Sequence, residues 1–237
     1  MINGIDILAN AAIMQISRLD CVANNIANVN TPGFKAERFL FLNPGPEAEA
    51  NKGRPAQTQE TTADYSRGIM QKTGNVLELA IDGDGFFAVQ TKAGVAYTKD
   101  GRFTLNKDGG LVTQAGDYVL GGGGKIAIEG NNVLISEDGV ISVDGNEVDT
   151  LKITGFSEPS ALVKLNPGLY LNPDNLAGAK KEENARVQSG YLELSNVQAI
   201  REMVEMINIQ RTFESYQKAI QTLGEQDKLS TSRIGRL

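Results

Sequence analysis

The stretch of sequence that decides the fold class is Asp82-Gly83-Asp84-Gly85-Phe86-Phe87-Ala88-Val89. It joins two Asp-Gly dipeptides, which favour tight turns because both residues tolerate positive φ, to a short apolar run of the kind found in strands. The same dipeptide recurs at Asp100, Asp108, Asp138 and Asp144. The region from Val76 to about Thr154 is therefore predicted to form a compact all-β domain with several hairpins.

The predicted strands are the apolar runs between these turns. They span residues 86–89, 95–98, 102–105, 118–120, 126–128, 133–135 and 140–143. Residues 43–65 are predicted to be an extended connector, because they contain three prolines, which are excluded from helix interiors and central strands. Residues 172–184, which begin with Asn-Pro-Asp-Asn, are predicted to be an exposed loop.

Apolar residues in the N-terminal segment are spaced three and four apart, which is typical of one face of a helix. The row consists of Ile5, Leu8, Ala12, Leu19, Val22, Ile26 and Val29, and Gln15 interrupts it. The helix is predicted to end between Asn28 and Pro32, because the residue before a proline avoids the helical region and Gly33 tolerates positive φ.

A second helix is predicted at the C-terminal end of the chain. Ser195 and Gln198 fit a capping box at its start, and no proline follows as far as Leu237. Its apolar row consists of Met206, Ile209, Phe213, Tyr216, Ile220 and Leu223, and a neighbouring stripe consists of Val197, Ile200, Val204 and Ile207.

Each apolar row needs a partner. The simplest arrangement pairs the two rows as an antiparallel or crossed helical pair, whose remaining apolar surface would bind further copies of the chain. The alternative is that both helices pack on the central domain, and the pattern alone leaves both arrangements open. The predicted fold class is a mainly β central domain with long N- and C-terminal α-helices that form a coiled-coil-like assembly region.

The composition excludes several classes of protein. A net charge of −6 provides no basic surface for nucleic acid. The sequence has no histidine and a single cysteine, Cys21, so neither a His/Cys metal cluster nor a Ser-His or Cys-His nucleophile pair can form. The apolar neighbours of Cys21 favour a packing role for it. A basic N-terminal region and a long apolar run are both missing, so we expect neither a cleaved signal peptide nor a membrane span.

Three patterns that suggest chemistry have simpler structural explanations. Residues 82–85 alternate carboxylates as a calcium loop does, but Phe86 stands where a further oxygen ligand is needed, so a turn is favoured. Residues 121–124 are all glycine, but no Gly-Lys-Ser/Thr ending follows, so a hairpin connection is favoured over a phosphate loop. The acidic residues show no paired-carboxylate motif. We therefore predict no catalytic, metal or cofactor site, and we do not expect an enzyme.

Three groups of residues resemble the flagellar basal-body rod and hook protein family. Residues 22–35, Val-Ala-Asn-Asn-Ile-Ala-Asn-Val-Asn-Thr-Pro-Gly-Phe-Lys, resemble its N-terminal motif. Residues 73–87 and 97–103 resemble the start of its β-rich domain, and residues 190–197 resemble its entry into the C-terminal helix. These matches follow the family's order along nearly the whole chain. The short connector and residues 64–68 are more similar to proximal than to distal rod members.

The resemblance implies a structural subunit of the rod, the tubular drive shaft that transmits torque. In this family the terminal helices of many copies pack into an inner tube and the β domain forms an outer layer. The implied partners are copies of the chain, other proximal and distal rod proteins and the flagellar type III export apparatus, without nucleic acid and without a membrane span. The implied location is the periplasm, after export without a cleaved signal. A distal rod or hook-type protein, a wall-cutting enzyme and a monomeric binding module remain alternatives.

The resemblance also assigns parts to the chain. Residues 1–32 and 191–237 would form the helical assembly region, residues 33–75 an extended connector, and residues 76–190 the β-rich outer domain. The predicted assembly residues are Ile5, Leu8, Leu19, Val22, Asn24, Asn25, Ile26, Asn28, Met206, Ile209, Phe213, Tyr216, Ile220 and Leu223. The three asparagines would either satisfy the end of the first helix or bond a neighbouring subunit.

Overall fold

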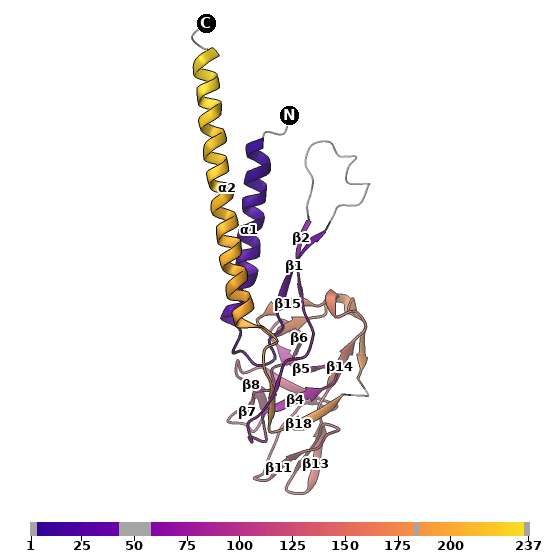
Figure 1. Cartoon of the computed structure of the whole chain (residues 1–237). Coiled ribbons are helices and arrows are strands. Elements are labelled where there is room, and N and C mark those ends of the chain that lie inside the picture. The colour runs from indigo at the N-terminus through magenta and orange to yellow at the C-terminus, as the bar shows by residue number, and fades with distance from the viewer. Residues whose placement is uncertain (1–3, 43–57, 183–184, 235–237) are drawn as a thin grey trace. The chain divides into compact units, whose positions relative to one another are not determined.

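The computed structural model describes residues 4–42, 58–182 and 185–234. It is mainly β, with one helix near each end of the chain, α1 at Gly4–Ala27 and α2 at Ala199–Ile234 (Figure 1). The chain forms two compact units. The helical unit contains α1, α2 and a hairpin of two strands, and the β unit contains residues 28–36 and 65–197. The chain therefore crosses between the units four times, at 27/28, 36/37, 64/65 and 197/198.

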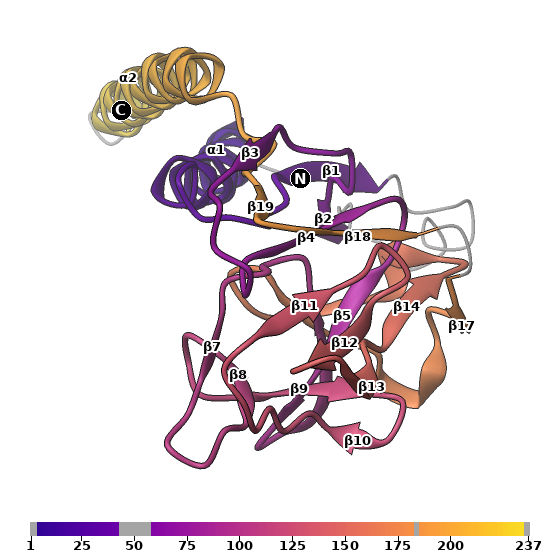
Figure 2. The same ribbon diagram turned by 90° about the horizontal axis from the view of Figure 1, so that it is seen from below.

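The helical unit contains an antiparallel pair of helices. α1 and α2 lie side by side in both views (Figures 1 and 2). Gly4, at the start of α1, lies near Leu223, since a Cβ on Gly4 would be 3.8 Å from the Leu223 Cδ1. Towards the other end of the pair, Arg18 forms an ion pair with Glu205. Of the two predicted pairings, antiparallel and crossed, the structure has the antiparallel one.

The predicted capping box at Ser195 is wrong. α2 begins four residues later, because the Glu202 N–H donates to the Gln198 carbonyl (3.0 Å), which makes Gln198 the cap. Ser195 instead accepts a hydrogen bond from the Val197 N–H (3.2 Å). The residues between them lie outside the helix, and there the side chain of Asn196 accepts a hydrogen bond from the Ala36 N–H (2.8 Å) within the β unit.

The hairpin of the helical unit consists of β1 (Glu37–Leu42) and β2 (Thr58–Ala63). The strands pair antiparallel from Glu37 opposite Ala63 to Leu42 opposite Thr58. The predicted extended connector over residues 33–75 thus contains regular strands at both of its ends. Its three prolines fall between residues 43 and 57, outside the described residues, so proline does not interrupt the ladder.

The β unit is built from antiparallel strands. Its largest sheet runs in the order β15-β16-β6-β5-β9-β8-β7, with β10, β14 and β17 attached at its sides; smaller sheets pair β11-β12-β13, β18-β4 and β19-β3. The strands are β3 Met70–Lys72, β4 Leu79–Asp82, β5 Phe86–Thr91, β6 Gly94–Thr98, β7 Phe103–Leu105, β8 Leu111–Thr113, β9 Tyr118–Gly121, β10 Gly124–Lys125, β11 Val133–Ile135, β12 Val140–Val143, β13 Asn146–Thr150, β14 Ile153–Phe156, β15 Val163–Asn166, β16 Leu169–Leu171, β17 Ala179–Lys181, β18 Arg186–Ser189 and β19 Tyr191–Glu193. Two short 3-10 turns lie at Pro159–Ala161 and Pro173–Asn175.

The predicted strands correspond to β5, β6, β7, β9, β11 and β12, but residues 126–128 do not form one. Ile126 and Ile128 are buried, yet their N–H groups donate to separate acceptors, the carbonyls of Val119 (3.2 Å) and Gly109 (2.8 Å). The run is apolar because its isoleucines are buried, although it does not form a strand. The Asp144-Gly145 turn joins β12 to β13 as predicted, and both of its residues have positive φ (52° and 88°).

One hydrophobic core holds the β unit together. It is centred on fully buried residues of β4, β5 and β9, including Leu79, Phe87 and Val119. The rings of Phe87 and Phe103 pack edge to face with centroids 5.1 Å apart. The core brings β4, which follows the predicted connector, and β18, which precedes the last helix, into one sheet.

Candidate assembly surfaces

Most of the predicted assembly residues lie on the inner face of the helix pair. These are Ile5, Leu8, Leu19, Val22 and Ile26 on α1, and Met206, Ile209, Phe213, Tyr216, Ile220 and Leu223 on α2, all of them buried or half-buried. Ile209 is the most enclosed, with 2% of its surface exposed. The structure therefore brings the two rows together within a single chain.

Asn25 ties α1 to the first strand of the hairpin. Its Nδ2 donates to the Glu37 carbonyl (2.9 Å), and its Oδ1 accepts from the Glu37 N–H (2.8 Å). The same amide nitrogen donates to the Glu202 carboxylate on α2 (3.2 Å). Asn24 donates to the Glu37 side chain (2.8 Å). The Asn28 side-chain oxygen accepts from the Thr31 hydroxyl (3.3 Å), and its backbone carbonyl accepts from the Thr31 N–H at the turn after α1 (3.1 Å). Two of the three asparagines thus bond a strand within the chain, a role that neither sequence alternative included.

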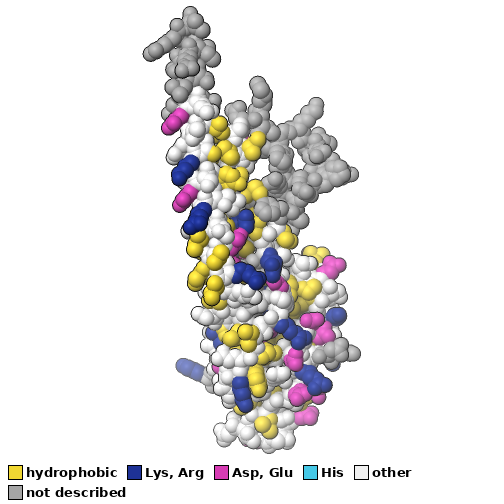
Figure 3. All heavy atoms as spheres, viewed as in Figure 1, with side chains coloured by type: hydrophobic (Ala, Val, Ile, Leu, Met, Phe, Trp, Pro, Cys, Tyr) yellow, Lys and Arg dark blue, Asp and Glu magenta, His cyan; other side chains and the backbone are white. Residues whose placement is uncertain are grey.

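The outer face of α2 carries an apolar row opposite the inner one. Ile200 is 81% exposed, and Met203, Val204 and Ile207 are about half exposed. Ile200, Val204, Ile207 and the exposed Arg211 follow one another at intervals of four, three and four residues, so they share one helix face. Figure 3 shows hydrophobic side chains on the surface along the helices. The row is an exposed apolar surface with a basic end.

α1 has a shorter outer row with acidic ends. Ile13 and Ile16 are about half exposed. The exposed Asp6 and Asp20 lie seven residues before and after Ile13, on the same helix face. The outer rows of the two helices are therefore both apolar at their centres and opposite in the charge that borders them.

A buried polar cluster occupies the β unit where three chain segments meet. Lys35 and Glu193 form an ion pair (Nζ to Oε1, 2.7 Å), and their side chains are 1% and 2% exposed. The Lys35 ammonium also donates to the Ser66 carbonyl (2.7 Å), and the Gly68 N–H donates to the Glu193 Oε1 (2.8 Å). Sequence reasoning gave this pair no role, because two charged residues 158 positions apart carry no spacing signal.

Lys99 lies close to this pair. Its ammonium donates to the Gly83 carbonyl (3.0 Å), and only 5% of the residue is exposed. Burial lowers the pKa of Lys99 to about 8, although the nearby Glu193 carboxylate acts in the opposite direction. The turn at residues 82–85, whose carboxylates alternate as in a calcium loop, therefore binds the Lys99 ammonium through a backbone carbonyl. Its Asp82 pairs with Arg67 (2.9 Å). Within the described residues, no three His, Cys, Asp or Glu side chains could hold a metal ion.

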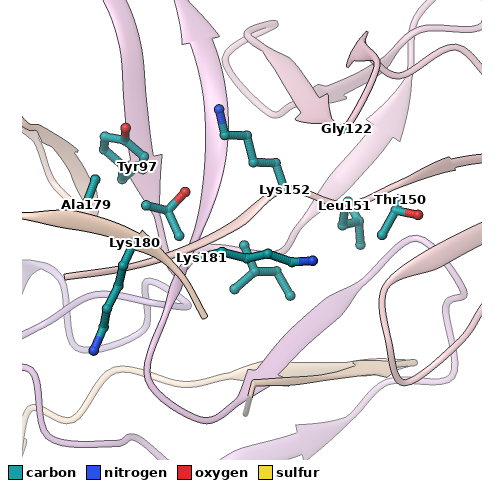
Figure 4. A pocket seen from close by; sticks show the side chains of 11 residues that line it. Tyr97, Gly122, Thr150, Leu151, Lys152, Ala179, Lys180 and Lys181 are labelled. Carbon is teal, nitrogen blue, oxygen red and sulfur yellow. The ribbon is translucent and has the colours of Figure 1, made fainter. Parts of the chain in front are cut away.

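A cavity with a volume of about 620 Å³ lies in the β unit (Figure 4). It is lined by the ends of β9 and β14, by β17 and by Tyr97. Lys152, Lys180 and Lys181 border it, but their amino groups point in three different directions (Figure 4). These cations do not converge on one point where an anion would sit.

Three family models match the chain in order. The model described as flagella basal body rod protein matches residues 5–35. The flagellar hook protein FlgE/F/G D1 domain matches residues 80–143, and the flagellar basal body rod FlgEFG protein C-terminal model matches residues 188–232. Together they cover α1, most of the β unit and most of α2.

Whole-length relatives carry the same kind of name. The flagellar basal-body rod protein FlgF of Caulobacter vibrioides is 37% identical over 234 residues, which cover 92% of this chain and 92% of that protein. The flagellar basal-body rod protein FlgG of Bacillus subtilis is 37% identical over 239 residues, covering 88% and 90%. The FlgF of Rhizobium meliloti is 32% identical over 242 residues, covering 94% and 99%. In the described part of the chain, neither helix is long and apolar enough to cross a membrane.

Proposed function

The chain belongs to the family of flagellar basal-body rod proteins, and from this we propose that it is a structural subunit of the proximal rod, FlgF rather than FlgG. Relatives of both names match at the same identity, so the choice rests on the short connector and on residues 64–68. Deleting the gene and complementing with each type tests the choice: restored motility from a FlgF, but not from a FlgG, is the expected result.

We further propose that copies assemble through their terminal helices into a coiled-coil-like tube that transmits torque. The observation that carries this is the exposed row from Ile200 to Ile207, because four large apolar side chains in a row on one helix are costly to leave in water. The inner rows would hold the helix pair of each copy together. The outer rows would then supply the contact between copies.

The two outer rows also differ from each other, which bears on symmetry. A contact between the α1 row of one copy and the α2 row of the next is head to tail, and such contacts build open helical assemblies instead of closed dimers. The acidic border of one row and the basic end of the other favour this pairing. Buried apolar area would supply most of the affinity, since exposed ion pairs contribute about 1 kcal/mol or less.

The remaining parts of the proposal follow from membership of the family. The partners would be other copies, the neighbouring proximal and distal rod proteins and the flagellar type III export apparatus. The site of action would be the periplasm, reached without a cleaved signal. Among the residues that the structure describes, no catalytic constellation supports an enzyme. A wall-cutting activity is therefore the remote alternative, and digestion of peptidoglycan by the purified chain would establish it.

The experiment that tests assembly replaces Val204 and Ile207 by aspartate in the full chain. Both side chains are exposed, so the helix pair should form normally, and circular dichroism of the purified variant should match the wild type. The variant should be missing from isolated basal bodies. Replacement of the exposed Gln217 on the same helix by aspartate serves as the control and should leave incorporation unchanged. Normal incorporation of the double variant would refute assembly through this face.

A further inference from the structure

The four chain crossings between the two units lead through one small region of the β unit. Residues 28–36 lie between the first two crossings, residue 65 follows the third, and residue 197 precedes the fourth. These three segments bond to one another directly. The Gly33 N–H donates to the Glu193 carbonyl (2.7 Å), and the Leu194 N–H donates to the Ile69 carbonyl (2.8 Å).

Side chains add a second layer of bonds among the same segments. Asn196 accepts from the Ala36 N–H (2.8 Å) and donates to the carbonyl and hydroxyl oxygens of Ser66 (3.1 and 3.0 Å). Lys35 bonds both Glu193 and Ser66, so one ammonium group reaches both other segments. We call these segments, residues 33–36, 65–69 and 193–197, the joint.

The segments of the joint are also closely packed against one another and against the rest of the β unit. Gly33 has a φ of 69°, and a Cβ placed on it would overlap the backbone of Lys99 and Asp100. A Cβ placed on Gly68 would overlap the carbonyl of Leu194. Phe34 is fully buried, with the Lys164 ammonium 4.9 Å from its ring centroid. Glycine at these positions therefore permits close contact between the three segments.

Few groups compensate the buried carboxylate of the ion pair at the centre of the joint. The Glu193 Oε2 is buried and accepts no hydrogen bond from the described residues, so Lys35 and the Gly68 N–H provide the direct compensation for this carboxylate. Loss of one partner would leave the other charge buried and unpaired, which is far costlier than loss of an exposed pair. The pair can therefore form only when the N-terminal and C-terminal segments are docked together.

We propose that the Lys35–Glu193 pair is a lock that makes docking of the three segments mutually dependent, and that the joint is the point through which load passes between the terminal helices and the β unit. The second part rests on the proposed function as a rod subunit. A drive shaft needs such a point, because torque taken up by the helices would pass to the β unit along the chain segments that connect them. Three segments braced by a buried ion pair resist displacement better than separate flexible linkers would.

The lock is tested on the purified full-length chain by amide hydrogen exchange. Lys35→Met keeps the length of the side chain and removes its charge, and Glu193→Gln keeps an acceptor for the Gly68 N–H. Each should speed exchange in residues 28–36 and 193–197 by about tenfold or more, while residues 86–98 of β5 and β6 keep their protection. The double variant K35M/E193L, which removes both charges of the pair together, should exchange more slowly than either single variant.

A matched control is Arg186→Met, which breaks the exposed pair of Arg186 with Glu137, also in the β unit. This variant should exchange as the wild type does. If K35M exchanges no faster than R186M, or if the single effects simply add in the double variant, the pair is not a lock and the proposal is overturned.

The proposed passage of load through the joint is tested in the parent bacterium with its own copy of the gene deleted. K35M should be present in isolated basal bodies and yet support slower swimming than R186M, with a difference that widens as the viscosity of the medium is raised. Equal swimming of the two variants at high viscosity would overturn the proposal that load passes through the joint. If the wild-type chain itself were missing from basal bodies, the proposed function would fail, whereas the exchange experiment would still judge the lock.

Discussion

The Asn25 amide pairs with both backbone groups of Glu37, accepting from its N–H at 2.8 Å and donating to its carbonyl at 2.9 Å. A side chain of α1 thus takes the place that a neighbouring strand would take beside β1. Asn25 itself is only 2% exposed, so water cannot replace these bonds. Together with the bonds of Asn24 and Cys21 to Glu37, this contact fixes the hairpin to α1.

Asn25→Ala should destabilise the helical unit by roughly 2–4 kcal/mol, because it removes two hydrogen bonds that the buried Asn25 side chain makes with the backbone of Glu37. Urea denaturation followed by helical circular dichroism measures the loss. Asn24→Ala is the comparison, since Asn24 donates to the half-exposed side chain of Glu37 and not to its backbone, and its loss should cost about 1 kcal/mol or less. Equal losses in the two variants would contradict this account.

Gly33→Ala should destabilise the β unit by about 3 kcal/mol or more, because the new Cβ would overlap the backbone of Lys99 and Asp100. Gly74→Ala is a matched control. Gly74 also has a positive φ (82°), but nothing lies within 4 Å of its added Cβ, so only the backbone strain of about 1 kcal/mol remains. The difference in denaturation midpoint between the two variants measures the crowding alone, and a difference of zero would show that the joint is not closely packed at Gly33.

Ile209→Ala and Ile200→Ala should distinguish the role of the inner row of α2 in stability from the role of its outer row in assembly. Ile209 is 2% exposed, so its truncation should cost about 2–4 kcal/mol and melt the helix pair at lower temperature. Ile200 is 81% exposed, and its truncation should change monomer stability by less than about 0.5 kcal/mol while reducing incorporation into basal bodies. An Ile200→Ala variant that assembles normally would argue against the outer row as the contact between copies.

Lys99 gives the β unit a pH dependence that can be predicted in sign. Because burial lowers the pKa of Lys99 from its ordinary 10.5 to about 8, the native state releases this proton at a lower pH than the unfolded chain does. Stability should therefore rise between pH 8 and 10, by roughly 2–3 kcal/mol from this group, and stay level below pH 8. Burial also raises the pKa of Tyr65 to about 12, which acts in the opposite direction only above pH 10.

The contribution of Lys99 is isolated by comparison with Lys99→Met. The difference in unfolding free energy between wild type and variant cancels the other titrating groups, including the neighbouring Glu193, Lys35, Asp84 and Arg67. That difference should shift in favour of the wild type from pH 8 to 10. A difference that does not change with pH would mean that Lys99 keeps an ordinary pKa.

Local pattern was enough to predict the helices and most of the central strands. The spacing of apolar residues defines both helices, and the Asp144-Gly145 turn has the positive φ values that its composition favours. The pattern gave a wrong prediction where buried residues do not share the hydrogen-bond ladder of a strand. Ile126 and Ile128 are apolar because they are buried, but their backbone bonds go to separate acceptors.

The joint was beyond the reach of sequence reasoning. Lys35 and Glu193 look like ordinary surface charges, and their pairing depends on the docking of segments from opposite ends of the chain. The same holds for Asn25, whose partner Glu37 becomes visible only when β1 returns alongside α1. In each case the residue type is typical of a helix end or a surface, and its role depends on a contact with a residue far away in the sequence.

Assembly through the outer rows is tested most directly by disulfide cross-linking in isolated basal bodies. The chain has a single cysteine, so a Cys21→Ser background carrying Ile16→Cys and Val204→Cys places one thiol on each outer row. Our account predicts a ladder of dimers and higher multimers on oxidation, which is lost when either new cysteine is omitted. Normal incorporation of the doubly substituted chain without any ladder would contradict it.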